Sequence, residues 1–199
     1  MDFNKSKTKE NLARAFAAEC QDGARYQFMA KAAVSEGFSF ISDQLKVLAK
    51  NEMAHASRLY QLMLNGCKGK EDNVPIEAGY PFEPPELATS LATAAEIENY
   101  EAKNIYPAFA KVAKDEGFDE IANVFLLDAE VEHQHYMKLQ ALAKLYKANK
   151  LYKSSQPVKW ECSNCGYAKT AKEAWNTCPL CGYGQGYAMI PQNIMAGGN

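Results

Sequence analysis

Residues 41–55 read ISDQLKVLAKNEMAH, and residues 121–135 read IANVFLLDAEVEHQH. Each stretch follows a glycine, Gly37 or Gly117, at the same interval, and each ends in Glu-x-x-His. Side chains three residues apart on a helix lie within about 60° of each other, so each motif presents a carboxylate and an imidazole on one face. The two stretches therefore predict an internal repeat in which each half carries one such motif.

The regions around these stretches have a helix-forming composition. Residues 5–66 and 85–149 are rich in Ala, Leu, Lys, Glu, Met and Gln, and the glycines at 37 and 117 are expected to form turns. The connection CKGKEDNVPIEAGYPFEPPE (67–86) is rich in proline and long enough to run along a bundle. Two helical hairpins joined by such a connection predict an all-α, ferritin-like four-helix bundle. The four helices are expected over about residues 5–35, 38–65, 85–115 and 118–149.

The last part of the chain carries a different signal. Four of the six cysteines form two Cys-x-x-Cys-Gly-Tyr knuckles, at Cys162, Cys165, Cys178 and Cys181. Four thiolates at this spacing bind one metal tetrahedrally. The spacing does not separate zinc from iron, so a structural zinc ribbon and a redox-active iron centre both remain open. The other two cysteines, Cys20 and Cys67, are expected to be inert thiols.

These signals divide the chain into three parts. The helical bundle is expected over residues 1–150, a linker over 151–158, and a small metal-binding domain over 159–199. The last part has aromatic residues and glycines around its cysteines but no helical period, so it depends on its metal to fold.

Charge and hydropathy exclude other classes of protein. The formal net charge is −2, from 22 basic and 24 acidic residues, and no basic block is dense enough to follow a run of phosphates. Nucleic acid is therefore not expected as a partner. No window approaches the ~18 apolar residues of a membrane span, and the start MDFNKSKTKENL lacks the apolar core of a signal peptide. We expect a cytoplasmic protein without membrane contact, in a reducing compartment where paired cysteines hold metal.

Two Glu-x-x-His motifs overlap in the fourth expected helix, at residues 130–133 and 132–135. A two-residue offset places them about 200° apart around the helix, so only one can face the core. The second motif shares its face with Ile121, Phe125 and Leu139, whereas the first lies among polar residues. We therefore expect Glu132 and His135 to point inward, and Glu130 and His133 to be solvated.

The other helices also place carboxylates among apolar side chains. Glu19 lies in line with Leu12 and Phe16, and Glu98 and Glu101 lie in the stripe of the third expected helix. Burying an unpaired carboxylate costs several kcal/mol, and five in one core repel one another, so cations must compensate them. Oxygen ligands with two imidazoles suit iron or manganese, and two ions balance the charge. The predicted metal ligands are Glu19, Glu52, His55, Glu98, Glu101, Glu132 and His135.

One spacing in the third expected helix is irregular. Glu19 precedes Tyr26 by seven residues, but Glu98 precedes Tyr106 by eight, and Pro107 follows directly. The extra residue predicts either a π-bulge or a simple kink at the proline.

With these motifs, the chain resembles the rubrerythrin family, in which a ferritin-like di-iron domain precedes a rubredoxin-like domain. The stretches that carry the resemblance are AFAAECQDGARY, ISDQLKVLAKNEMAH, AAEIENYEAKNIYPAFA, IANVFLLDAEVEHQH, KWECSNCGY and CPLCGY. The resemblance implies two irons in the bundle and one iron at the four cysteines, where zinc is a possible substitute. It also implies that Glu52 and Glu132 bridge the irons, that Glu19 binds the first, and that Glu98 and His135 bind the second.

The resemblance further assigns four residues to catalysis. The family's first iron moves between a glutamate when oxidised, here Glu101, and a histidine when reduced, here His55. Tyr26 and Tyr106 match the family's tyrosines beside the ligands. One departure is Asp128, where the repeat and the family lead us to expect an apolar residue; an acidic group one turn before Glu132 is expected to hold a water or shift the local potential.

The function that the resemblance implies is hydrogen peroxide reduction in defence against oxidative stress. Electrons would come from an NAD(P)H-dependent reductase or a rubredoxin and enter through the Fe(Cys)4 centre of a head-to-tail homodimer. One alternative is an iron-handling ferroxidase, which needs no electron-entry module. The other is a zinc-ribbon-bearing binding protein, which would be colourless and without turnover.

Overall fold

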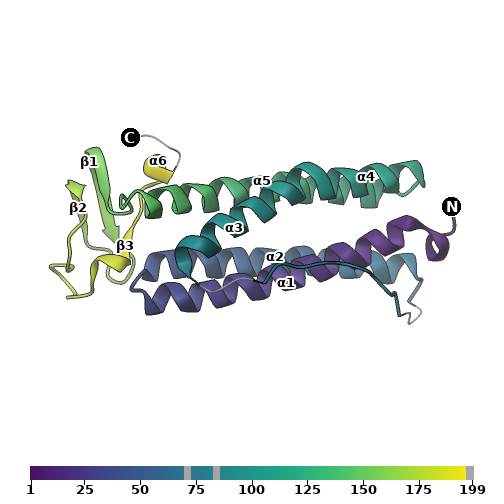
Figure 1. Ribbon diagram of the computed structural model, residues 1–199, viewed down its shortest axis with the longest axis horizontal. Coiled ribbons are helices and arrows are strands. Elements are labelled where there is room, and N and C mark those ends of the chain that lie inside the picture. The colour runs from purple at the N-terminus through teal and green to yellow at the C-terminus, as the bar shows by residue number, and fades with distance from the viewer. Residues whose placement is uncertain (70–72, 83–85, 196–199) are drawn as a thin grey trace. The chain divides into compact units, whose positions relative to one another are not determined.

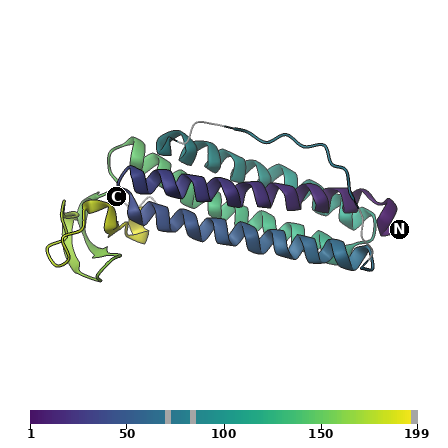
Figure 2. The same ribbon diagram turned by 90° about the horizontal axis from the view of Figure 1, so that it is seen from below.

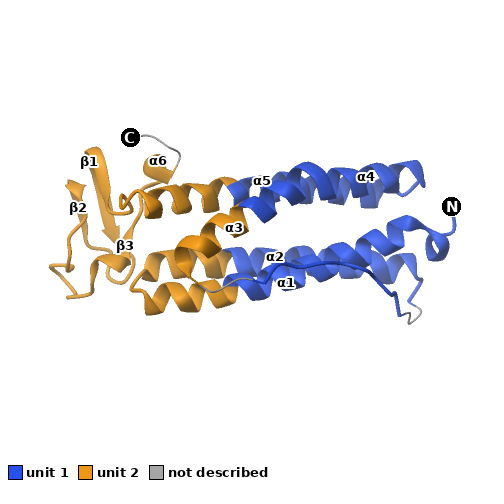
Figure 3. Ribbon diagram, viewed as in Figure 1, with its two compact units in different colours: residues 1–26, 48–83, 96–136 blue, residues 27–47, 84–95, 137–199 orange. Residues whose placement is uncertain are grey.

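The structure is a computed structural model that describes residues 1–69, 73–82 and 86–195. Parts of the expected connection at 67–86, the first residue of the helix expected from 85, and the end of the domain expected to reach 199 lie outside the described residues. The chain forms two compact units (Figure 3). Unit 1 comprises residues 1–26, 48–83 and 96–136, and unit 2 comprises residues 27–47, 84–95 and 137–199.

The helices follow the order expected for a ferritin-like bundle (Figure 1), and each expected end lies within two residues of the observed one. After a short 3₁₀ helix, Phe3–Lys5, the first hairpin consists of α1 (Lys7–Ser35) and α2 (Ser39–Gly66). The second consists of α3 (Leu87–Tyr100), a π-helical turn (Glu101–Ile105), α4 (Tyr106–Asp115) and α5 (Asp119–Lys147). None of these helices, within the part of the chain that is described, is long and apolar enough to cross a membrane.

The two hairpin turns have the same backbone geometry. Gly37 and Gly117 each have a φ of 86°, a left-handed conformation that glycine adopts without steric cost. The N–H of the residue after each glycine donates to the carbonyl five residues back, Ala33 at 2.7 Å and Ala113 at 2.8 Å. These are the bonds of a Schellman cap, so the repeat in the sequence is also a repeat in the backbone.

The π-helical turn accounts for the irregular spacing in the second hairpin. In a regular α-helix, the eighth residue after Glu98 would be rotated about 100° from the position of the seventh. The wider turn at Glu101–Ile105 absorbs the extra residue before Pro107. Tyr106 and Tyr26 are each 1% exposed, and both therefore reach the interior. Of the two interpretations of the spacing, the π-bulge is confirmed.

The apolar core of unit 1 fixes the helices around the buried acids. It brings together side chains from α1, α2, α4 and α5, including Leu12, Leu59 and Phe125, each with no exposed area. At the start of α1, the backbone N–H groups of Lys7 and Thr8 donate to the Glu116 carboxylate at 2.9 and 2.8 Å. Because these are donors that a helix leaves unpaired at its first turn, this cap ties the two hairpins together. Figure 2 shows the helices in a second view.

Unit 2 contains the sheet of the cysteine region. Strands β1 (Lys153–Cys162), β2 (Ala168–Glu173) and β3 (Ala188–Met189) form an antiparallel sheet in the order β2-β1-β3, followed by the short helix α6 (Gln192–Met195). Residues 153–158, expected as part of a linker, belong to β1. The sequence gives no strand signal there, because both faces of this half-strand are largely exposed and carry polar side chains.

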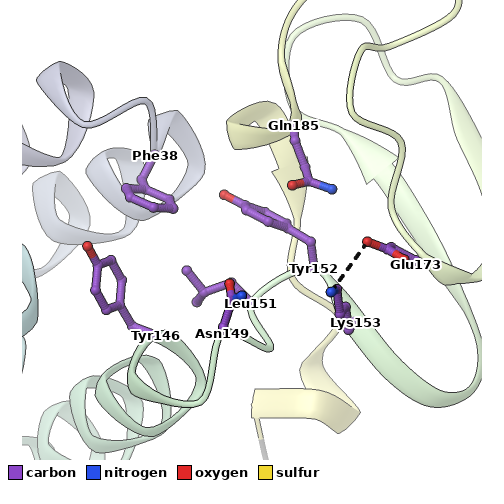
Figure 4. Close-up of a pocket in the computed structure, with 8 residues that line it drawn as sticks. All are labelled: Phe38, Tyr146, Asn149, Leu151, Tyr152, Lys153, Glu173 and Gln185. Atoms are coloured by element: carbon purple, nitrogen blue, oxygen red, sulfur yellow. Dashed lines mark ion pairs between the residues drawn. The ribbon is translucent and has the colours of Figure 1, made fainter.

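A pocket of about 390 Å³ lies within unit 2 (Figure 4). On one side the ring of Phe38 packs against Tyr146 and Tyr152, with centroids 5.3 and 6.4 Å apart. On the other, Lys153 and Glu173 form an ion pair at 3.8 Å. None of the predicted site residues lines this pocket.

Candidate metal centres

The acids predicted from the sequence converge inside unit 1. Each of α1, α2, α3 and α5 contributes a glutamate that is 1–3% exposed. Two groups of potential ligands result, and within each group the ligand atoms lie within 4.8 Å of one another. The first group is Glu19, Glu52, His55 and Glu132; the second is Glu52, Glu98, Glu132 and His135.

Glu52 and Glu132 belong to both groups, and their oxygens divide between the two histidines. Glu52 places Oε2 3.1 Å from Nδ1 of His55 and Oε1 3.1 Å from Nδ1 of His135. Glu132 places Oε1 3.0 Å from Nδ1 of His55 and Oε2 2.7 Å from Nδ1 of His135. One carboxylate that faces two sites with different oxygens is suited to bridge two metal ions.

Each group is completed by one further carboxylate. Oε2 of Glu19 lies 3.2 Å from Nδ1 of His55, and Oε2 of Glu98 lies 3.7 Å from Nδ1 of His135. Behind them, Tyr26 donates a hydrogen bond to Glu98, and Tyr106 donates one to Glu19. The tyrosines therefore hold Glu19 and Glu98, which each belong to one group. Glu52 and Glu132, which belong to both groups, face the two histidines.

The electrostatics of this cluster call for cations. Burial raises the pKa of Glu19 to about 8 and that of Glu98 well above its usual range. Burial opposes a charged His135, but the carboxylates around it outweigh this and raise its pKa to about 12. Burial likewise opposes a charged Glu132, but the histidines beside it lower its pKa to about 2. Burial also opposes a charged His55, but its carboxylate neighbours raise its pKa well above the usual range, so protons on both imidazoles supply positive charge beside the carboxylates.

Several atoms of the cluster are buried without a hydrogen bond of suitable angle. They are both carboxylate oxygens of Glu52 and of Glu132, Oε2 of Glu98, and Nδ1 of His135. A buried polar atom without a partner is costly. Each of these residues offers a ligand atom that lies within 4.8 Å of the other ligand atoms in its group. Carboxylate oxygens with one imidazole per group form a donor set that iron accepts. The residues present therefore fit two metal ions.

Glu101 lies outside both groups. It begins the π-helical turn and is half-buried, with a pKa raised well above its usual range by burial and then by Asp22 and Glu98. Six of the seven ligands predicted for the bundle thus lie in the two groups. His55 is one of these six, and Glu101 is the seventh, which lies outside them.

The fourth helix presents the face expected from the sequence. Glu132 and His135 are 1% and 3% exposed, whereas Glu130 and His133 are exposed. The overlapping motif therefore takes no part in the cluster.

Three residues near the cluster are not among the ligands predicted from the sequence. Asp22 is 6% exposed and pairs with Arg25 at 3.1 Å; burial raises its pKa to about 7. The sequence does indicate Asp22, because Asp22 follows Glu19 at the same interval at which Glu101 follows Glu98.

The second, Asn51, lies 3.3 Å from His135, and the spacing gives no hint of this contact because the residues are 84 positions apart. The third, Asp128, stands where the sequence repeat places Leu48 in the other half. It is 7% exposed, burial raises its pKa to about 6, and its Oδ2 has no hydrogen-bond partner.

The four cysteines of unit 2 form the second candidate centre. Sγ of Cys162 lies 3.8 Å from that of Cys181, and Sγ of Cys165 lies 3.7 Å from that of Cys178. A tetrahedral site with metal–sulfur bonds of about 2.3 Å has sulfur–sulfur edges of about 3.8 Å. The cysteines are therefore spaced for one metal ion, and none of them forms a disulfide.

The two knuckles are built alike. Gly166 and Gly182, which follow the second cysteine of each, have φ values of 74° and 76°. Their N–H groups donate to the carbonyls of Cys162 and Cys178 at 2.8 and 2.9 Å. Such turns aim backbone N–H groups toward the sulfur atoms, which stabilises thiolate charge. Cys20 and Cys67 lie outside this cluster.

Comparisons with known proteins agree with this architecture. The sequence matches the family described as Rubrerythrin over residues 10–143, and the family described as "Rubrerythrin, rubredoxin-like domain" over residues 160–187. A rubrerythrin from Clostridium perfringens is 40% identical over 183 residues, covering 92% of this chain and 93% of the relative. A nigerythrin structure in a partially reduced state aligns with a TM-score of 0.61 and 26% identity, covering 96% of this chain and 94% of that one. A Desulfovibrio desulfuricans bacterioferritin, 18% identical with a TM-score of 0.55, covers 73% of this chain and 86% of its own, and shares the fold.

Proposed function

Since this chain belongs to the rubrerythrin family, we propose that it reduces hydrogen peroxide to water at a di-iron centre in its helical bundle. The family combines a di-iron site with a rubredoxin-like Fe(Cys)4 site, and this chain carries a donor set for each. It is thus an iron protein of a family associated with oxidative stress. The observation that supports the proposal most strongly is the pair of ligand groups that share Glu52 and Glu132.

The proposed ligands follow the two groups. Glu52 and Glu132, which belong to both groups, would hold both irons, Glu19 and His55 would hold the first, and Glu98 and His135 would hold the second. At the other centre the ligands are Cys162, Cys165, Cys178 and Cys181, with iron as the resident metal and zinc as a possible substitute.

The two metal ions, when bound, orient the oxygens of hydrogen peroxide and supply one electron each. The chain contributes the geometry around them. Tyr26 and Tyr106 hold Glu98 and Glu19 by donated hydrogen bonds, so these carboxylates keep their orientation. Glu101 would be the alternative to His55 as a ligand of the first iron in the oxidised state. It begins the π-helical turn, and such turns are frequent at functional sites.

The four-cysteine centre favours a peroxidase over an iron-storing ferroxidase. Reducing hydrogen peroxide consumes two electrons and two protons per molecule, and a Fe(Cys)4 centre returns electrons one at a time. A ferroxidase takes its electrons from the iron it oxidises and needs no such module. We propose an NAD(P)H-dependent reductase or a rubredoxin as the donor, a head-to-tail homodimer as the assembly, and the cytoplasm as the location.

The proposal is tested on the protein produced with iron in excess. We expect about three irons per chain, visible absorption from ferric thiolate, and NADH oxidation that requires both hydrogen peroxide and an added reductase. The spectrum also separates the alternatives. A colourless protein with one zinc per chain and no peroxide turnover would contradict the proposal. Iron at both centres with oxidation of added Fe(II) but no reductase-dependent turnover would favour the ferroxidase.

A further inference from the structure

The two histidines of the cluster are held differently on the side away from the carboxylates. The amide of Asn51 places Nδ2 3.3 Å from Nε2 of His135. The three polar contacts that the described residues make with the His55 ring, by contrast, all involve Nδ1. The side chain of His135 is 3% exposed and that of His55 is 14% exposed.

The sequence repeat explains this difference. It relates residues 41–55 to residues 121–135, so Asn51 and His135 correspond to Val131 and His55. The place from which Asn51 reaches His135 is thus occupied, in the other half, by a valine with no hydrogen-bonding group. Val131 is half-buried, as Asn51 is.

A histidine that binds metal through Nδ1 must carry its proton on Nε2, and that N–H needs an acceptor. A rotation of 180° about the Cβ–Cγ bond of Asn51 exchanges the places of Nδ2 and Oδ1. The amide oxygen then lies where it can accept the hydrogen bond from Nε2 of His135. A hydrogen bond to the far nitrogen of a ligand fixes the tautomer and the orientation of the ring. Val131 has no hydrogen-bond acceptor and therefore does not fix the ring of His55 in this way.

We propose that Asn51 is a positioning residue that keeps His135 on its metal in both oxidation states, and that Val131 leaves His55 free to leave its metal. The inference deepens the proposed function and rests on it, because it requires a di-iron site that cycles. It assigns part of the asymmetry between the two irons to one pair of repeat-related residues.

Three variants test the role of Asn51 directly. Asn51→Leu keeps the branched shape of the side chain and removes the acceptor, Asn51→Asp restores an acceptor, and Val131→Leu is the matched control in the other half. Each is titrated with Fe(II) under anaerobic conditions against a competing chelator. We expect Asn51→Leu to weaken one of the two bundle irons by at least ~10-fold, Asn51→Asp to regain most of that loss, and Val131→Leu to resemble the wild type.

Val131→Asn tests the converse. It offers His55 the acceptor that His135 has, so crystal structures of this variant should show His55 on the metal in both the reduced and the oxidised state. The wild type should show His135 on the metal in both states and His55 only in the reduced one.

The outcomes separate this inference from the function on which it rests. A wild type that does not bind two irons in the bundle defeats both. A wild type that binds two irons and turns over peroxide upholds the function. If the wild type behaves in this way, two results would each overturn the role of Asn51. One is an Asn51→Leu variant with unchanged iron affinity, and the other is an Asn51→Asp variant that binds iron as weakly as Asn51→Leu. A His55 that leaves the metal in oxidised Val131→Asn would overturn the role of Val131.

Discussion

At the scale of single residues, the cluster makes the metal-free protein sensitive to pH. The pKa of Glu19 rises from 4.5 to about 8 on folding and that of His135 from 6.5 to about 12, so both groups hold protons in the native state that the unfolded chain releases. Stability must then fall as the pH rises from 5 to 8, by up to about 1.4 kcal/mol per pH unit for each group within its window. Glu132, with a pKa of about 2, adds a contribution that is constant over this range.

We therefore expect the melting temperature of the chelator-treated protein to decrease between pH 5 and pH 8, as followed by circular dichroism. Glu19→Gln should flatten the dependence, since the amide does not titrate. The difference between the melting temperatures of the iron-loaded and the metal-free protein should increase with pH, because metal displaces protons and binds more tightly at higher pH. A metal-free protein whose melting temperature rises over this interval would show that the buried acids are not protonated as we infer.

The overlapping motifs in α5 allow a second test with built-in controls. Glu132→Ala and His135→Ala should each lower bundle iron content and peroxide turnover at least ~10-fold, since each removes a proposed ligand. Glu130→Ala and His133→Ala change the exposed motif on the same helix and should behave as the wild type. The reverse pattern, measured as iron per chain, would mean that the functional face of α5 is the exposed one.

At the scale of secondary-structure elements, the π-helical turn is the feature with a measurable role. A π-turn is less favourable than α-helix, and such turns are frequent at functional sites. Deleting Asn104, an exposed residue within the turn, would give the second hairpin the seven-residue spacing of the first. We expect this variant to fold with an unchanged or higher melting temperature and to bind iron, but to turn over peroxide more slowly, because the turn that positions Glu101 beside the cluster is removed. Full turnover in the deletion variant would remove the π-turn from the mechanism.

Much of the architecture follows from patterns that the sequence carries openly. The helices obey a 3.6-residue period, and acids such as Glu52 and Glu98 stand out because they interrupt an apolar stripe. The first half of β1 was missed because its exposed faces show no alternation. The contact between Asn51 and His135 was missed for another reason. It joins two helices, and only their packing decides which residue of one meets a given residue of the other.

At the scale of the whole molecule, the chain divides its proposed tasks between the bundle and the cysteine centre. Cys162→Ser should abolish the ferric-thiolate absorption and leave helical content nearly unchanged, because the long helices end at Lys147. Turnover with NADH and a reductase should be lost. A chemically reduced sample should still be oxidised by one equivalent of hydrogen peroxide, as followed by the absorption of the bundle iron in a stopped-flow experiment. Normal reductase-linked turnover in this variant would place electron entry elsewhere.

The matching turns at Gly37 and Gly117 have a consequence for how such a site can diversify. Two identical hairpins that associated as a symmetric pair would have to carry every substitution twice, once beside each iron. Joining the halves in one polypeptide removes that constraint. Three differences between the halves are ones that a symmetric pair of identical hairpins could not carry: Asn51 opposite Val131, Asp128 opposite Leu48, and the extra residue that only the second hairpin holds. A single polypeptide that holds both halves can therefore place different residues beside its two metal sites.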